Sequence, residues 1–182
     1  GMFPSAAFAT DSNVVTYPVT GGNIYFNKST GAVTNCDKSV TEVMIPRKIE
    51  GVVVQEIGNC AFRYCYDLEN IIIPDSVTII GEEAFRSCRN LKSIIIPDGV
   101  TVIEDYIFSD CNSLNSIYIP DGIVKIGDYA FYGCSNLKNI ELPDSITEIG
   151  VNVFNYCNSL SYIKIPGNVT QMGGVDFYGC SS

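Results

Sequence analysis

The sequence repeats itself with a period of about 23 residues, which constrains the fold more than any other feature and is typical of solenoid repeats. Five kinds of residue recur with this period and in the same register. The prolines are Pro74, Pro97, Pro120, Pro143 and Pro166, and the phenylalanines are Phe62, Phe85, Phe108, Phe131, Phe154 and Phe177. The other columns are Cys65, Cys88, Cys111, Cys134, Cys157 and Cys180; Leu68, Leu91, Leu114, Leu137 and Leu160; and Ile57, Ile80, Ile103, Ile126, Ile149 and Met172. In a solenoid each coil buries its apolar face only against its neighbours.

One repeat, residues 91–113, predicts how a coil begins. Ile94 and Ile96 lie two residues apart, so both point to the same side of an extended chain and enter the core. Pro97 has no amide hydrogen and ends this first short strand. The residues that follow, Asp98 and Gly99, favour a turn.

The rest of the repeat predicts a second strand and a compact connection. Val100 and Ile103 are the expected inward pair of the second extended run. A turn or a short helical segment then buries Phe108 and Cys111. The sequence therefore predicts a β-rich solenoid.

These residues also carry a family resemblance. The pattern I-P-D-x-[VI]-T-x-I-G-x-x-A-F-x-x-C-x-x-L resembles the BspA-like, or Treponema-type, leucine-rich repeat, most clearly over residues 73–91 and 119–137. Leu142 replaces isoleucine before Pro143, a departure that keeps the site apolar. The resemblance covers residues 40–182 and implies a right-handed leucine-rich-repeat coil. It also implies a secreted or cell-surface bacterial protein that adheres to host or bacterial surface and extracellular proteins.

The chain is expected to divide into three parts. Residues 1–16 are predicted to be a disordered leader or the remnant of a signal peptide, because Ala-Phe-Ala at 7–9 resembles the end of one. Residues 17–39 are predicted to be an N-terminal hairpin cap, with strands near 23–27 and 32–34. The array of about six coils then covers residues 40–182.

Two departures from the period lead to further expectations. Pro46 and Pro74 are separated by more than one period, and we expect the extra residues, within 47–54, to lengthen the second strand and its turn. In the last coil Asp176 replaces a small apolar residue, and no polar capping unit follows. An uncapped end exposes apolar surface, so we expect that a longer protein continues beyond Ser182.

Composition argues against several classes of function. The net charge of −9 repels phosphate backbones, so nucleic acid is not an expected partner. No apolar run approaches the roughly 20 residues of a membrane span, so membrane insertion is not expected. The absence of histidine removes the usual general base and the usual neutral metal ligand. We therefore expect neither an enzyme nor a bound cofactor.

The cysteine column has three possible interpretations. Equivalent residues of stacked strands lie about 4.8 Å apart, and parallel side chains keep their Cβ atoms near that distance, beyond the ~3.8 Å that a disulfide prefers. Buried free thiols are therefore the favoured interpretation, ahead of disulfides and of metal binding. Cys36 is expected to top the column one residue out of register. If one bridge exists, Cys36 or Cys60 is the expected participant.

An acidic column could attract calcium, but it has a simpler explanation. Its members follow the prolines: Asp75, Asp98, Asp121 and Asp144. Stacked carboxylates are possible calcium ligands. Aspartate also suits a turn, because its side chain can bond to nearby backbone amides. Turn chemistry is favoured, and no metal site is predicted.

The outward-facing residues of the first strand are the candidate binding site. They are Met44, Ile72, Ile95, Tyr118, Glu141 and Lys164, flanked by Glu42, Asn70, Ser93, Ser116, Asn139 and Tyr162. An apolar row on an exposed concave face, with a polar rim, is typical of interaction surfaces. The β-propensity of isoleucine and tyrosine alone could also select them.

The size of this strip limits what it can do alone. Six strands cover on the order of 300 Å², whereas a specific interface buries about 800 Å² per partner. The sequence therefore predicts a protein-binding or adhesion module that binds weakly, recruits its loops or belongs to a longer array. The alternative is a rigid structural spacer in a larger surface protein.

Overall fold

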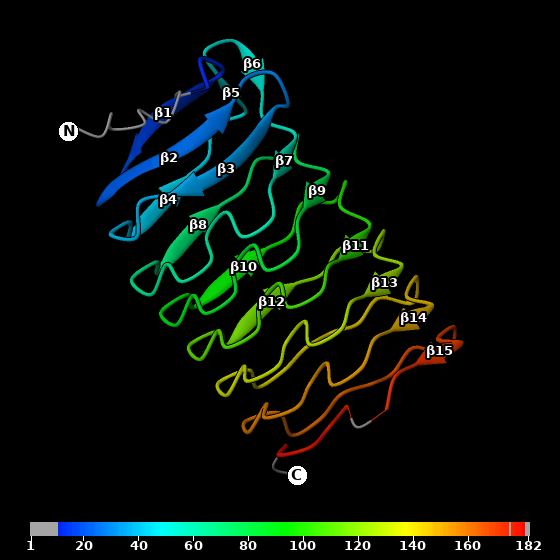
Figure 1. The fold of residues 1–182 in the computed structure, drawn as a ribbon. Coiled ribbons are helices and arrows are strands. Elements are labelled where there is room, and N and C mark those ends of the chain that lie inside the picture. Colours follow the sequence, from blue (N-terminus) through cyan, green and yellow to red (C-terminus); the bar gives the residue numbers. More distant parts are fainter. Residues whose placement is uncertain (1–10, 175, 181–182) are drawn as a thin grey trace, which may run out of the picture.

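The computed structural model describes residues 11–174 and 176–180, and its coils stack into one elongated solenoid (Figure 1). Two rows of short strands run along the stack. The first row consists of β4 (Glu42–Met44), β8 (Asn70–Ile72), β10 (Ser93–Ile95) and β12 (Ser116–Tyr118). The second row consists of β7 (Glu56–Ile57), β9 (Ile79–Ile80), β11 (Val102–Ile103), β13 (Lys125–Ile126), β14 (Glu148–Ile149) and β15 (Gln171–Met172).

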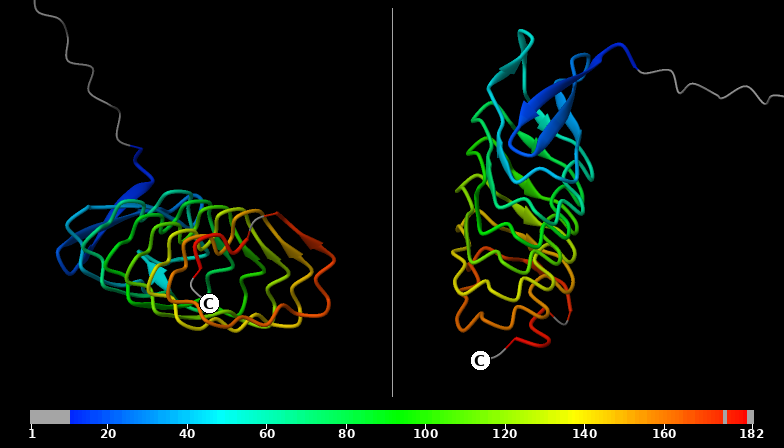
Figure 2. Two further views of the ribbon diagram at one scale, coloured as in Figure 1. Left: turned by 90° about the horizontal axis from the view of Figure 1, so that it is seen from below. Right: turned by 90° about the vertical axis from the view of Figure 1, so that its left-hand side faces the viewer.

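The strand pairing shows that one sequence period makes one coil. In the second row Ile103 pairs with Ile126, and Ile126 pairs with Ile149, in parallel register. In the first row Ile94 pairs with Ile117, which stands at the same position of the next repeat. The views along and across the stack show the same succession of similar coils (Figure 2). The predicted β-solenoid is confirmed.

A column of stacked rings forms the centre of the core. The six repeated phenylalanines, from Phe62 to Phe177, stack with ring centroids 5.4 to 5.8 Å apart. The first five are completely buried, and the predicted inward residues Ile94 and Ile103 are buried beside them. A ring on one coil thus becomes inaccessible only when the next coil covers it. The coils share a single interior.

The segment that carries these rings forms consecutive turns and, within the described residues, no helix. The expectation of a turn holds, and the alternative of a short helical segment is wrong. Alternate amides in this segment bond to the next coil: the Phe108 N–H donates to the Ala130 carbonyl at 2.9 Å, and the Tyr106 N–H donates to the Asp128 carbonyl at 2.9 Å. The amides between them bond three residues back in their own coil, as the Ser109 N–H does to the Tyr106 carbonyl at 3.1 Å. Inter-coil bonds and i to i−3 turn bonds therefore alternate here, in place of the i to i−4 bonds of a helix.

The N-terminal cap has three strands, one more than expected. β1 (Val14–Val19), β2 (Gly22–Asn27) and β3 (Ala32–Cys36) form an antiparallel meander, and β3 then pairs in parallel with β7. The hairpin of β2 and β3 is confirmed. The expected boundary between leader and cap falls inside β1, because pairing with β2 orders residues 14–16. Residues 1–10 of the expected leader lie outside the described residues.

The extra residues near position 50 make a separate hairpin. β5 (Lys48–Ile49) and β6 (Val52–Val53) pair antiparallel around Glu50 and Gly51, which both have positive φ, 47° and 79°. Two consecutive residues in this conformation make a tight turn that reverses the chain. The expectation of a longer second strand is therefore wrong.

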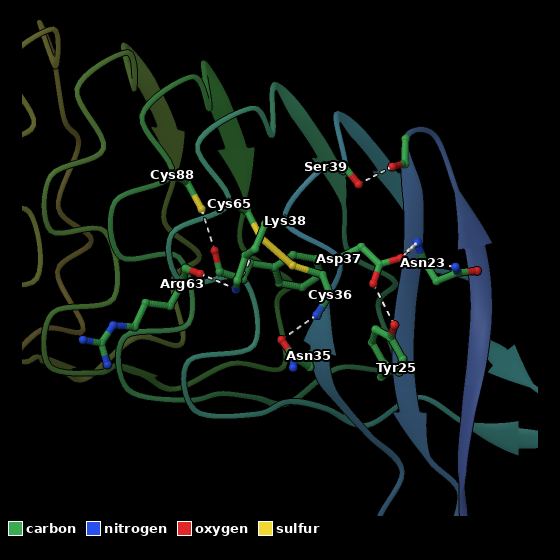
Figure 3. Close-up of a disulfide and its surroundings, with 12 residues drawn as sticks. Asn23, Tyr25, Asn35, Cys36, Asp37, Lys38, Ser39, Arg63, Cys65 and Cys88 are labelled. Carbon is green, nitrogen blue, oxygen red and sulfur yellow. Dashed lines mark hydrogen bonds between the residues drawn. A yellow bond between two sulfur atoms is a disulfide. The ribbon is translucent and has the colours of Figure 1, made fainter. Parts of the chain in front are cut away.

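A disulfide joins the cap to the first coil (Figure 3). It links Cys36, on β3, to Cys65. The expectation of a free thiol is wrong for these two cysteines. Of the two participants expected for a single bridge, Cys36 is bridged and Cys60 is free. Side chains on stacked repeats keep their Cβ atoms too far apart for a disulfide, but this does not apply to Cys36. That residue lies on a strand of the antiparallel cap and not on a repeated coil.

A half-buried carboxylate holds the adjoining turn of the cap. Asp37 accepts hydrogen bonds from the Tyr25 hydroxyl at 2.7 Å and from the Asn23 amide N–H at 2.8 Å (Figure 3). The bond from Tyr25, followed by those from Asn23, lowers the pKa of Asp37. The carboxylate therefore stays charged where it ties β2 to the chain leaving β3.

The proline–aspartate segments form the expected turns, but their backbone closes them. The Val100 N–H donates to the Pro97 carbonyl at 3.1 Å, and Ile123 donates to Pro120 in the same way. Within the described residues the side chains of Asp98 and Asp121 make no hydrogen bond. Asp75 instead pairs with Arg47 at 2.7 Å.

Candidate functional site

The outward residues of the first strand row lie in register on one face. We call Met44, Ile72, Ile95 and Tyr118 the strand face. Met44 pairs with Ile72 and Ile95 pairs with Tyr118, so the side chains are neighbours across parallel strands. Between 51% and 70% of each side chain is exposed, while the residues between them point into the core. The alternation follows from the pleat of a strand with one buried side.

The predicted continuation of this row has a different backbone. Residues 139–141 and 162–164 form no strand, although the chain passes through the same part of each coil. Glu141, Tyr162 and Lys164 nevertheless line one hollow together, with a volume of about 520 Å³. Tyr162 is 71% exposed. The structure thus places these three predicted residues together, next to the strands of the first row.

Shallow hollows separate the side chains of the strand face. One is lined by Ile72 and Ile95 and has a volume of about 400 Å³. Tyr118 and Glu141 line another, of about 350 Å³. Hollows of this size are large enough to receive individual side chains of a partner.

The cap extends this surface in a way that the sequence analysis missed. A hollow of about 400 Å³ is lined by Tyr17 and Val19 of β1 and by Met44 and Ile72 of the first row. Thr20, just after β1, forms a bridge with Glu42 at the edge of β4. The alternating apolar residues at positions 15, 17 and 19 are the signal that could have revealed this strand.

The four central members of the cysteine column contribute to packing and are not accessible as nucleophiles, whereas Cys180 is a partly exposed free thiol. Cys88, Cys111, Cys134 and Cys157 are buried free thiols, as predicted. Each donates to the carbonyl of a phenylalanine on the preceding coil; for Cys134 and Phe108 the distance is 3.1 Å. Burial raises the pKa of Cys88 and of Cys157 to about 12. These thiols stay protonated at neutral pH and act as small apolar groups with one weak donor.

Neither a metal centre nor a membrane span is found in residues 11–174 and 176–180. No group of three or more potential ligands is placed to hold a metal ion there. No helix in this part of the chain is long and apolar enough to cross a membrane.

The chain is similar to known leucine-rich-repeat proteins. The BspA type leucine rich repeat region matches residues 55–182, in six copies. The leucine-rich repeat protein of Treponema pallidum is 28% identical, with a TM-score of 0.73 over 88% of this chain and 83% of that chain. A leucine-rich repeat protein from Bacteroides ovatus is 31% identical, with a TM-score of 0.74 over 96% of this chain.

A third solved structure shares the fold and is larger. It is a leucine rich cell surface protein from Faecalibacterium prausnitzii, 25% identical, with a TM-score of 0.56 over 88% of this chain. The chain spans 55% of that protein and 45% of the Bacteroides ovatus protein. None of the curated proteins is significantly similar in sequence.

Proposed function

Because the chain belongs to the BspA-type leucine-rich repeat family, we propose that it is a non-catalytic module that binds proteins through its strand face. The proposed partners are surface or extracellular proteins of a host or of bacteria. The proposed location is the bacterial cell surface or the secreted fraction. The description of the Faecalibacterium prausnitzii relative as a cell surface protein supports this location.

The observation that carries the proposal is the row of exposed apolar side chains in register. Ile95 is 70% exposed although its neighbours Ile94 and Ile96 are buried, so folding of this chain leaves its apolar surface in water. Covering it with a partner would recover about 25 cal/mol for each Å² removed from water. Apolar residues surrounded by Glu42, Asn70, Ser93 and Ser116 match the apolar core and polar rim of protein interfaces.

The cap increases the area available to a partner. Tyr17 and Val19 extend the surface beyond Met44, and Tyr162 with Lys164 extends it at the other end. A strip of only the short strands would bury much less than a typical interface. The proposed contact therefore includes both extensions.

The test uses a matched pair of double variants. Ile95→Lys with Tyr118→Lys places two cations on the strand face. Ile79→Lys with Val124→Lys places the same two cations beside the second strand row, where both residues are also exposed. Binding of the fluorescently labelled protein to intact epithelial cells and to whole bacteria is measured by flow cytometry.

We expect the strand-face variant to lose more than tenfold in binding and the control to bind as the parent does. Loss of binding by the strand-face variant alone would support the proposal, because a partner that covers the strand face would bury two unpaired charges, which is costly. If neither cell type binds the parent, or both variants bind equally, the strand face is not the docking surface. A rigid spacer, for which the continuous column of rings is suited, would give that result.

A further inference from the structure

A second surface lies on the turn segments that carry the phenylalanines. Five tyrosines there contact one another in a chain that crosses successive coils: Tyr106, Tyr129, Tyr132, Tyr156 and Tyr178, which we call the tyrosine strip. Their ring centroids lie 4.8, 5.6, 5.2 and 5.5 Å apart in that order. Tyr156 is 41% exposed and Tyr178 is 61% exposed. The strip is distinct from the strand face, which uses the first strand row.

Three of these tyrosines occupy a costly backbone conformation. Tyr106, Tyr129 and Tyr156 have φ values of 56°, 56° and 60°. A bulky residue rarely adopts this left-handed conformation, whereas glycine adopts it without a steric penalty. The positions equivalent to Tyr156 in the coils before and after it are Gly133 and Gly179, at φ 72° and 75°. The position of Tyr106 and Tyr129 is held in other coils by Cys60, Glu83 and Asn152, at φ 58°, 55° and 55°. The turns thus accept several residue types in this conformation, and the fold does not require tyrosine there.

The surroundings of the strip are acidic. The segments 104–111, 127–134, 150–157 and 173–180 contain no lysine or arginine, but they contain Glu104, Asp105, Asp110, Asp128 and Asp176. Burial and then Tyr156 and the Asp110 carboxylate raise the pKa of Tyr132. Asp110 forms no salt bridge within the described residues. Lys125 interacts with the charges of Glu104, Asp105 and Asp128. The strip thus combines aromatic rings with the Asp110 carboxylate, whose charge no ion pair of the described residues offsets.

In the first coils, arginine side chains already lie over tyrosine rings. The Arg86 guanidinium lies over the Tyr106 ring, 5.1 Å from its centroid, and Arg89 lies over Tyr66 at 4.6 Å. Each arginine reaches an aromatic ring on a neighbouring coil. The same turn segments in the later coils supply no guanidinium, because serine, tyrosine and asparagine stand at 109, 132 and 155 where Arg86 stands at 86.

We propose that the tyrosine strip is a second binding surface, which takes an arginine-rich polypeptide segment. Guanidinium groups of that segment would lie on the rings from Tyr129 to Tyr178, as Arg86 lies on Tyr106. The Asp110 carboxylate would pair with one of them. Arginine fits better than lysine, because its planar group stacks on aromatic faces and is less strongly hydrated.

Three peptides of equal length provide the probes: five Arg-Gly, five Lys-Gly or five Glu-Gly repeats, acetylated and amidated. Affinity is measured by isothermal titration calorimetry at low ionic strength and again at higher salt. The test variant is Tyr132→Ser with Tyr156→Ser. The matched control is Tyr64→Ser with Tyr66→Ser, which removes two exposed tyrosines outside both proposed surfaces and leaves the net charge unchanged; their rings already lie against Arg63 and Arg89.

The parent should bind the arginine peptide several-fold more tightly than the lysine peptide and should not bind the glutamate peptide. The Tyr132/Tyr156 variant should lose on the order of tenfold for the arginine peptide, from two cation–π contacts. The control should stay within about twofold of the parent.

Two further variants keep the test independent of folding defects. Tyr132→Phe with Tyr156→Phe retains both rings and should bind nearly as the parent does. Asp110→Asn retains every ring and should weaken binding a few-fold. Equal affinity for the arginine and lysine peptides, with no effect of the serine pair, would mean attraction by net charge alone and would overturn the proposal. Absence of arginine-peptide binding by the parent would also overturn it. None of these outcomes depends on cell binding through the strand face.

Discussion

Replacing Phe108 by alanine would measure how strongly the coils depend on one another. The ring is completely buried between Phe85 and Phe131, with centroids 5.7 and 5.6 Å away. Its loss removes a transfer free energy of about 2 kcal/mol. A cavity of roughly 100 Å³, if unfilled, adds up to ~2.4 kcal/mol. We therefore expect the free energy of unfolding to fall by about 3–5 kcal/mol.

Phe177→Ala is the matched control, because the ring belongs to the same column. It stacks on Phe154 at 5.8 Å and remains 40% exposed. Its removal leaves no enclosed cavity. Only part of the ring's transfer free energy and its contact with Phe154 are lost. We expect a loss of about 1–1.5 kcal/mol.

Urea titrations followed by far-ultraviolet circular dichroism give both free energies, and the m-values show whether the same unit unfolds. If Phe108→Ala does not fold, Phe108→Leu serves instead, with an expected loss of about 1–2 kcal/mol. The reasoning is refuted if the two alanine variants lose the same stability, or if Phe108→Ala loses less than about 1 kcal/mol.

Three other predictions concern the backbone and the thiols. Gly127→Ala should destabilise by about 1–3 kcal/mol in a urea titration, because its Cβ would lie 2.6 Å from the Asp105 backbone nitrogen; a neutral result would contradict this close approach. In denaturant, six thiols should react with Ellman's reagent before reduction and all eight afterwards, whereas in the native protein Cys88 should stay unreacted. Burial raises the pKa of Cys88 and Cys157 from about 9.0 to about 12, so the folded state keeps protons that the unfolded state loses. The free energy of unfolding should therefore be constant with respect to these thiols below about pH 9 and should fall between pH 9 and 12. In urea titrations across this range, Cys157→Ala should reduce that fall. An unchanged dependence of the free energy on pH would count against the burial of this thiol.

The sequence predicted the repeated part of the fold because each period is one physical unit. Identical spacing of Phe85, Phe108 and Phe131 demands equivalent environments, and stacking is the arrangement that buries all three. The strand face followed from the same register, since side chains alternate along a strand. Its outward residues lie where the pattern predicted them, although strands of the first row stop after β12.

The non-repeated parts were harder to predict, because no second copy of their pattern exists in the chain. β1 pairs through its backbone with β2, and the residues of 14–19 alone do not reveal a partner. The disulfide between Cys36 and Cys65 depends on how the cap approaches the first coil. The tyrosine strip joins residues from three different repeat columns, so it becomes visible only when the turns are folded.

Contacts between successive phenylalanine rings test the central claim most directly, because a shared interior requires them. In a nuclear Overhauser experiment on the protein with labelled phenylalanine rings, Phe85 should show contacts to Phe62 and Phe108, and Phe131 to Phe108 and Phe154. Within the repeated column, cross-peaks only between rings of adjacent repeats are the predicted result. Rings that lack these cross-peaks, or that contact rings from distant repeats, would contradict a single core shared by successive coils.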